Sequence, residues 1–298
     1  MATTTVSTSP KPGSGHGAAG PVAERPSPWR RFRDPSLPIL VAVLLGIWAL
    51  TSRFTAEYTV PTIPSVAQEM WSILTSWESL RNLLTTLARV GVGLAAAFAV
   101  GLALGLAMGA SSAAARYLLP LIRFVQGIPS LSWVIIAVIW FADVELRVWF
   151  VMVLVTLPGF ALQTYDSYRA IPAELRDMAR SFRPGRWALF REITLPAITP
   201  GVFTAWKVNL GLGIRMVLIA ELVGATVGVG AQLLSAQQLF DMASVVSWTL
   251  LLAVCMLIIQ GVVELLESWV LRYRPRVGLP SEASGRAATS VAAPRVEG

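Results

Sequence analysis

Long apolar runs separated by short polar turns dominate the chain between residues 37 and 271. A helix of about 20 apolar residues is long enough to cross a lipid bilayer. The pattern predicts an all-α, polytopic membrane protein with six transmembrane helices. We expect these helices at residues 37–53, 83–115, 124–142, 148–165, 201–224 and 242–270.

Polar segments divide the predicted spans into domains. Residues 1–36 and 272–298 are rich in small and polar residues and predict disordered tails. Residues 54–82 hold an amphipathic stretch, 66–77, and predict an extracytoplasmic segment at the membrane interface. Residues 83–271 then form a predicted core of five helices.

The composition excludes a water-soluble globular protein. Hydrophobic residues make up 55% of the chain and charged residues 14%, with a mean hydropathy of +0.63, so too little polar surface remains to cover a core in water. The single His16 lies in the first tail and the single Cys255 in an apolar run. We therefore expect membrane lipid around the chain and no metal site.

The net charge of +7 is interpreted as a topology signal rather than as a sign of nucleic-acid binding, because basic loops stay in the cytoplasm. With six spans, one side of the membrane receives most of the arginines, and both termini are predicted to be cytoplasmic in a bacterial inner membrane. The predicted cytoplasmic clusters lie at residues 30–33, 116–123, 166–200 and 272–276, and the other side receives Arg53, Arg81 and Arg147.

Small residues indicate where helices pack or break. Gly101, Gly105 and Gly109 follow one another at four-residue spacing and predict a flat face for close helix packing. Arg116 and Arg123 are expected to bracket a short basic turn, and the next predicted span is broken near its start at Pro129.

The longest internal polar stretch, residues 166–200, predicts two short amphipathic helices separated by a turn at Gly185. Such helices are too polar to insert in the membrane and too apolar to remain uncovered, which favours docking in a groove of a partner protein. The stretch contains Asp177-Met178-Ala179 and ends in Ile193-Thr194-Leu195-Pro196. It resembles the EAA loop of ABC importer permeases, whose pattern is Glu-Ala-Ala-x(3)-Gly-x(9)-Ile-x-Leu-Pro.

The loop departs from that pattern in two places. Met178 replaces the first Ala, and Arg183 stands where the family has Gly, with a glycine only at Gly185. The resemblance implies that the loop couples the membrane helices to an ATPase subunit. The coupling residues it implies are Asp177, Ala179, Arg180, Arg183, Gly185, Ile193, Leu195 and Pro196.

A wider likeness, from about residue 61 to residue 273, is to the permeases for nitrate, sulfonates and taurine. It includes the segments 87–93, 126–129, 139–141, 220–221 and 228–230. This resemblance implies an importer with two permease copies, two ATP-binding subunits and an extracytoplasmic solute-binding protein. The chain has no Gly-x-x-x-x-Gly-Lys-Ser/Thr motif, so ATP and Mg are expected on the partner ATPase, with no cofactor and no catalytic residue on this chain.

Three charges, Lys207, Arg215 and Glu221, interrupt the fifth predicted span. Arg215 and Glu221 lie six residues apart, too far along and around a helix to form a simple pair. Charges within spans usually face a cavity or a partner. We hypothesise that Arg215 favours an anionic substrate; a salt bridge or snorkelling is the alternative. Glu221, Gln126 and Pro129 complete the candidate substrate path. Gln126 and Pro129 are expected to shape a gate through a kinked helix, and ordinary packing is the alternative for Pro129.

Several functions stay open at this point. A permease for a neutral or aromatic solute, such as a pyrimidine precursor or an aromatic carboxylate, belongs to the same family. A secondary transporter or channel working alone is less favoured, since the chain shows six predicted spans, no obvious internal repeat and a docking loop. A membrane enzyme would need clustered His, Asp or Ser groups at membrane depth, which the sequence does not place there.

Overall fold

The computed structural model describes residues 36–56, 58–174, 178 and 185–273, and every described element is helical. The chain divides into two compact units, residues 1–51 and 52–298. The first unit contains most of α1 (Ser36–Phe54), an apolar helix whose described side chains are largely exposed. The second contains α2 (Ile63–Thr75), α3 (Trp77–Ala110), α4 (Ser112–Gly127), α5 (Ser130–Trp140), α6 (Val144–Arg169), α8 (Arg186–Leu189), η2 (Phe190–Thr194), α9 (Leu195–Leu222), α10 (Val229–Gln238), α11 (Met242–Val270) and η3 (Leu271–Tyr273).

Short polar side chains cap the start of five of these helices. Ser76 caps α3 and Ser111 caps α4, each accepting a hydrogen bond from a backbone N–H in the first turn. Asp143 accepts one from the backbone N–H of Leu146 at 2.9 Å and so begins α6. These caps satisfy amide donors that have no partner inside the helix, which explains why the boundaries fall at polar residues.

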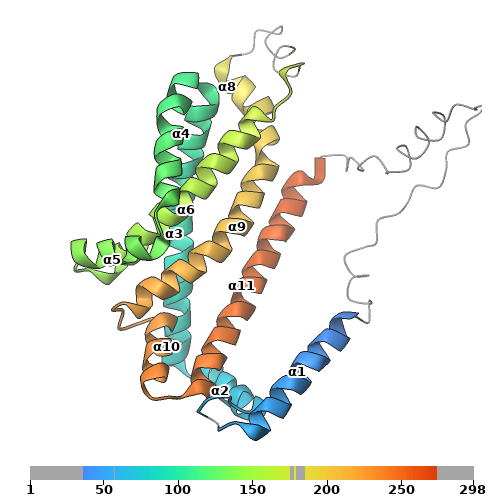
Figure 1. The fold of residues 1–298 in the computed structure, drawn as a ribbon. Coiled ribbons are helices and arrows are strands. Elements are labelled where there is room, and N and C mark those ends of the chain that lie inside the picture. The colour runs from blue at the N-terminus through green and yellow to red at the C-terminus, as the bar shows by residue number, and fades with distance from the viewer. Residues whose placement is uncertain (1–35, 57, 175–177, 179–184, 274–298) are drawn as a thin grey trace, which may run out of the picture. The chain divides into compact units, whose positions relative to one another are not determined.

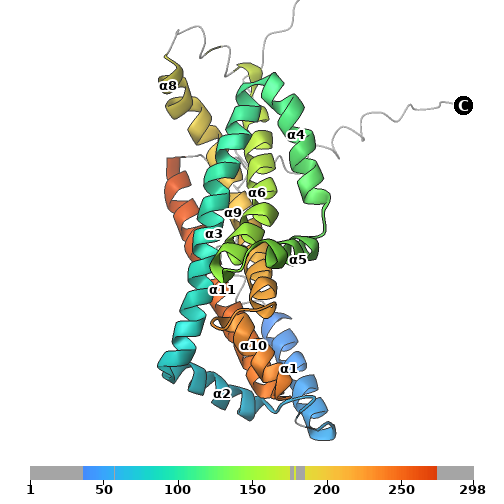
Figure 2. The ribbon, with the colours of Figure 1, turned by 90° about the vertical axis from the view of Figure 1, so that its left-hand side faces the viewer.

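Four helices in the second unit form its body. Figure 1 shows α3, α6, α9 and α11 running alongside one another, with α8 at one end and α2 and α10 at the other. Figure 2 gives the same order from the side. We call these the α8 end and the α10 end. α2 is tied to α11, because the Ser247 hydroxyl donates to the carbonyl of Val66 at 3.1 Å.

A glycine stripe brings α3 and α6 together. A side-chain carbon at Gly101 would lie 2.7 Å from Phe160 Cβ, and one at Gly105 would lie 2.7 Å from the backbone oxygen of Ala161. Gly109 lies against Tyr168 in the same way. The predicted flat packing face is therefore confirmed, and its partner is α6.

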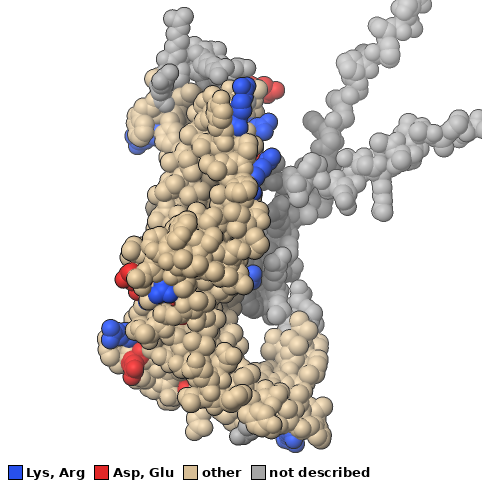
Figure 3. Space-filling view, turned by 60° about the vertical axis from the view of Figure 1, so that its left-hand side comes forward, with Lys and Arg blue, Asp and Glu red and all other residues tan. Residues whose placement is uncertain are grey.

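The length and apolar composition of the helices account for four spans among the described residues: 77–110, 144–169, 187–222 and 242–270. A fifth follows if α4 and α5 are counted as one broken span, since they meet at an angle of 90°. The helical fold is confirmed, whereas the count of six spans stays a prediction. On the face shown in Figure 3, a broad surface without charged residues separates charged groups near the α8 end from a mixed cluster lower down.

The third predicted span is corrected by the structure. The break at Pro129 is confirmed, but Arg116 and Arg123 lie within α4 instead of bracketing a turn. The helix forms there because Ser111 caps its start and its apolar face packs beside α3 and α6, which bury Ile122. The two arginines lie on the exposed side of α4, so their charge does not interrupt the helix.

Candidate functional site

The α8 end carries the described part of the predicted coupling loop. Asp177, Ala179, Arg180 and Arg183 lie outside the described residues. Gly185 is exposed, and α8 begins immediately after it, as the predicted turn requires. Ile193 and Pro196 are half-buried and Leu195 is exposed.

A π-helical turn joins α8 to α9. The backbone N–H of Leu195 donates to the carbonyl of Phe190, five residues back. The cause is Pro196, which has no N–H and crowds the carbonyl four residues before it. The wider π turn lets the helix continue past the proline. Residues 187–222 thus form one helical run of 36 residues from the α8 end to the α10 end.

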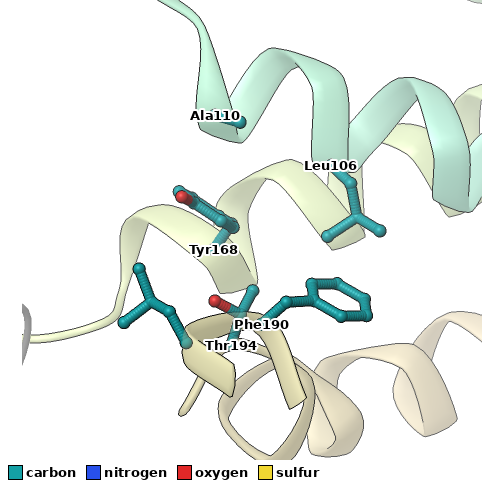
Figure 4. Close-up of a pocket in the computed structure, with 6 residues that line it drawn as sticks. Leu106, Ala110, Tyr168, Phe190 and Thr194 are labelled. Atoms are coloured by element: carbon teal, nitrogen blue, oxygen red, sulfur yellow. The ribbon is translucent and has the colours of Figure 1, made fainter. Parts of the chain in front are cut away.

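Two aromatic side chains start this run. Trp187 is 70% exposed, and its ring stacks on that of Phe190 with centroids 5.8 Å apart. Beneath them lies a pocket of about 460 Å³. Figure 4 shows Leu106 and Ala110 of α3 and Tyr168 of α6 facing it. It is otherwise lined by Leu189, Phe190 and Thr194.

A buried polar network occupies the opposite end of α9. Glu221 is fully buried. Its carboxylate forms an ion pair with Arg89 at 2.6 Å and accepts hydrogen bonds from Thr86 at 2.9 Å and from the backbone N–H of Gly230 at 2.8 Å. A charge in such a place is stabilised only when it is paired and hydrogen-bonded, and Glu221 meets both conditions.

Arg89 links this carboxylate to two further elements. Its Nε donates to Glu145 at the start of α6 at 3.0 Å, and its NH1 donates to the carbonyl of Val227 at 2.7 Å. A planar guanidinium with five donors suits such divergent partners. Arg89 therefore joins α3, α6, α9 and the turn that follows α9.

The same face of α3 holds that turn. Asn82 accepts a hydrogen bond from the backbone N–H of Gly228 at 2.9 Å, and Thr86 accepts one from Val229 at 2.8 Å. Gly228 has a φ of +125°, and a side-chain carbon there would lie 2.5 Å from the Glu221 carboxylate. Only glycine fits this conformation and this approach. We call Asn82, Thr86, Arg89 and Glu221 the α3–α9 clamp.

The clamp was not predicted from the sequence. Asn82, Thr86 and Arg89 follow at intervals of four and three residues, so they share one helix face, and this spacing was the signal that could have found them. Their partners on α9 and in the turn after it are 132 or more residues away in the chain, and nothing local indicates that pairing.

The candidate path residues are not brought together. Glu221 is enclosed in the clamp, so its carboxylate does not face a water-filled path in this conformation. Gln126 and Pro129 lie exposed at the bend between α4 and α5. Arg215 lies on the exposed side of α9, and the described residues give it no ion pair.

Comparison with known proteins agrees with this fold. Residues 97–272 match the family described as "Binding-protein-dependent transport system inner membrane component". The chain is 18% identical to a chain of the MetNI methionine ABC transporter in an inward-facing conformation, with a TM-score of 0.59 over 65% of this chain and 96% of the other. This likeness shows a shared fold.

Curated relatives include permeases for different solutes. The chain is 26% identical to a nitrate import permease of Leptolyngbya laminosa, over 65% of this chain and 73% of the relative. It is 28% identical to a riboflavin transport permease of Chloroflexus aurantiacus, over 85% and 96%. It is also 28% identical to a putative aliphatic sulfonates transport permease of Escherichia coli, over 78% and 89%. Together with the family match and the apolar helices, these relatives show that the chain belongs to the binding-protein-dependent inner membrane components, the multi-pass permeases of ABC importers.

Proposed function

We propose that this permease is driven by ATP hydrolysis on a separate subunit that docks at the α8 end. The observation that carries the proposal is the exposed Trp187 at the start of a helical run that reaches the α10 end. An exposed aromatic pair at the tip of a helix is suited to a hydrophobic groove on a partner. The four coupling residues outside the described part, Asp177, Ala179, Arg180 and Arg183, are proposed to extend this docking surface.

The helical run would act as a lever. Leu195 and Pro196 set the π turn, so a push on α8 passes into α9 without a break in the helix. The pocket of about 460 Å³ beneath Phe190 leaves room for α8 and η2 to shift against α3 and α6. Ile193 and Gly185 belong to the same moving segment.

The α3–α9 clamp would carry the movement to the far end of the membrane. Because Arg89 and Thr86 hold both Glu221 and the turn at residues 223–229, a displacement of α9 moves that turn together with α3. This gives Glu221 a role in transmission instead of direct substrate contact. Gln126 and Pro129 at the α4–α5 bend stay candidates for the path.

The proposed assembly contains two copies of this chain, two ATP-binding subunits and an extracytoplasmic solute-binding protein. ATP and Mg would bind the ATPase subunits, and this chain would hold no cofactor. The α8 end and both termini are proposed to face the cytoplasm, because positive residues cluster on that side.

The proposed substrate is a small anion of the nitrate or sulfonate type. Relatives named for nitrate and aliphatic sulfonates support this choice. The relative named for riboflavin covers more of the chain, which favours a larger neutral or aromatic solute as the second candidate. The charge on Arg215 separates the two.

The docking proposal is tested by replacing Trp187. We expect Trp187→Ala to reduce co-purification of the partner ATPase subunit, measured as the ratio of the two chains in tagged preparations. Trp71 at the α10 end is also 70% exposed, so Trp71→Ala is a matched control and should leave the ratio unchanged. Equal ATPase recovery with both variants would contradict docking at the α8 end.

A further inference from the structure

Arg215 is a cation at membrane depth for which the described chain supplies no ion pair. It lies on α9 seven residues before Leu222, on the same exposed side as Val208 and Leu212. Both neighbours are apolar, with exposed fractions of 60% and 37%. A charged side chain in such surroundings is costly unless water or a counter-charge meets it.

Two layers of paired charge bracket Arg215 along α9. Towards the α8 end, Lys207 forms an ion pair with Glu267 of α11 at 2.5 Å. Towards the α10 end, Glu221 pairs with Arg89 in the clamp. From Arg215 these layers are about 12 Å and about 9 Å away along the helix axis. Their carboxylates are already paired, and both lie more than one helical turn from Arg215.

The same apolar stretches in a second copy of the chain also offer no counter-charge. The stretches of the other spanning helices contain no charged residue at 90–115, 148–165 or 242–263, and the short helix α5 contains none at 130–140. A homodimer repeats these stretches, so an interface at mid-membrane would place apolar side chains opposite Arg215. The salt-bridge alternative for Arg215 is therefore not supported by any carboxylate at its level.

Snorkelling is disfavoured by position. Long basic side chains relieve their charge at the membrane surface when they lie near helix ends. Arg215 lies seven residues before the end of α9, so its charge would have to travel about 10 Å along the axis to reach the helix end. Its guanidinium therefore requires a water-filled space or an anion within the assembled transporter.

We infer that Arg215 is an anion-binding residue of the transport path, where its guanidinium forms charge-assisted hydrogen bonds to an oxyanion substrate such as nitrate or a sulfonate. A planar guanidinium can donate two parallel N–H bonds to such a group. This inference rests on the proposed importer function and names the substrate class that the path accepts. It also selects the anionic class over a neutral solute.

The first test is access to water. In a Cys255→Ala background, the cysteine introduced by Arg215→Cys should react with a membrane-impermeant cationic methanethiosulfonate reagent. Leu257, a 67% exposed apolar residue of α11, gives the lipid-facing control Leu257→Cys, which should stay unmodified. Modification of position 215 no faster than that of position 257 would overturn the inference. This measurement needs no ATPase subunit.

The second test is charge. The permease is co-expressed with its ATPase subunit, and the complex is placed in nanodiscs with the solute-binding protein. ATP hydrolysis is then measured with nitrate, taurine, ethanesulfonate and riboflavin as separate probes. Arg215→Leu should reduce stimulation by the active anion about tenfold or more, as expected for the loss of a hydrogen bond to a charged group. Arg215→Lys should retain part of it. The exposed Arg116 of α4 gives the control Arg116→Gln, which should respond as wild type.

Charge rescue completes the experiment. Treating the Arg215→Cys complex with the cationic reagent should restore stimulation, whereas a neutral reagent of similar size should not. Equal rescue by both reagents, wild-type stimulation of Arg215→Leu, or stimulation of the wild type by riboflavin alone would overturn the anion site. Failure of the ATPase to co-purify with the wild-type chain would instead overturn the proposed function.

Discussion

At the scale of single residues, Arg89 is the centre of the buried polar network. It is 5% exposed, and its donors reach Glu145, Glu221 and Val227 on three different segments. Glu145 is partly exposed, with 42% of its side chain accessible, whereas Glu221 is enclosed. The two ion pairs of Arg89 should therefore differ in their contribution to stability.

Removing Arg89 should destabilise the protein strongly. Arg89→Met leaves the Glu221 carboxylate buried without its counter-charge, which costs about 3–5 kcal/mol. Thermal unfolding of the purified permease in detergent should show a clearly lower midpoint for Arg89→Met than for Glu145→Gln. The double variant Arg89→Met/Glu221→Met should recover part of the loss, because no unpaired charge remains. A double variant less stable than Arg89→Met would contradict this explanation.

The glycine stripe predicts opposite effects for two glycines of one helix. Gly105→Ala should lower the unfolding midpoint, since the new methyl group meets backbone atoms of α6, and overpacking costs about 1–3 kcal/mol. Gly91 has no atom within 4 Å of the corresponding position. Gly91→Ala should leave the midpoint unchanged or raise it, because alanine favours helix. The midpoints can be compared in one detergent series, and a similar loss for both variants would argue against close packing of α3 on α6.

How far residues could be predicted depended on whether their partners lie nearby in the chain. Gly101, Gly105 and Gly109 carry their packing signal in their own spacing, so the flat face was found from the sequence. The sequence predicts that Glu221 lies on the substrate path, because a single acidic residue within a span suggests a water-filled cavity. Its partner Arg89 is on another helix, and only the fold shows that the two meet.

At the scale of elements, the proposed coupling depends on the turn between α8 and α9. Pro196 would break an ordinary α-helix, yet the π turn at residues 190–194 carries the helix through. The pocket beside that turn is lined by Ala110 at the end of α3. A larger side chain there would fill the space that the lever needs.

Filling the pocket should weaken the stimulation of ATP hydrolysis by substrate. We expect Ala110→Phe to reduce substrate-stimulated ATP hydrolysis roughly threefold or more, since it obstructs a conformational step. Ala107 is an exposed neighbour on α3 outside the pocket, so Ala107→Phe is the control. The comparison is made in nanodiscs with the same ATPase preparation, and unchanged stimulation in Ala110→Phe would show that the pocket plays no part in coupling.

Element prediction succeeded where hydropathy and caps agree. The last span, expected at residues 242–270, matches α11 at both ends, because Asp241 caps its start and its residues up to 263 are uncharged. α4 was missed because Arg116 and Arg123 interrupt its apolar residues, and a helix that hides one face against neighbours tolerates charges on the other. Those neighbours, α3 and α6, meet α4 only in the folded protein, so the sequence pattern of α4 alone does not reveal them.

At the scale of the whole molecule, the distribution of basic residues predicts which end faces the cytoplasm. In a Cys255→Ala background, an impermeant thiol reagent should label the cysteine of Thr226→Cys, near the α10 end, in intact spheroplasts. It should label the cysteine of Arg116→Cys, near the α8 end, only after permeabilisation. Both native side chains are exposed. The reverse labelling pattern would invert the proposed topology.

The family could be predicted from the sequence because the end of the coupling loop, Ile193-Thr194-Leu195-Pro196, and the order of the apolar runs survive in the linear chain. The assembly is expected only from the resemblance to the family. The groove proposed to receive Trp187 belongs to another chain, so its surface leaves no pattern in this sequence.

The most direct test of the central claim is substrate uptake by proteoliposomes that contain the permease, its ATPase subunit and its solute-binding protein. Nitrate, taurine and riboflavin are supplied one at a time, with ATP enclosed in the vesicles. We expect accumulation of an anion only when all three components and ATP are present, with little accumulation in the Arg215→Leu complex. Uptake by the permease alone, without ATP, would contradict the account of this chain as the path of an ATP-driven importer.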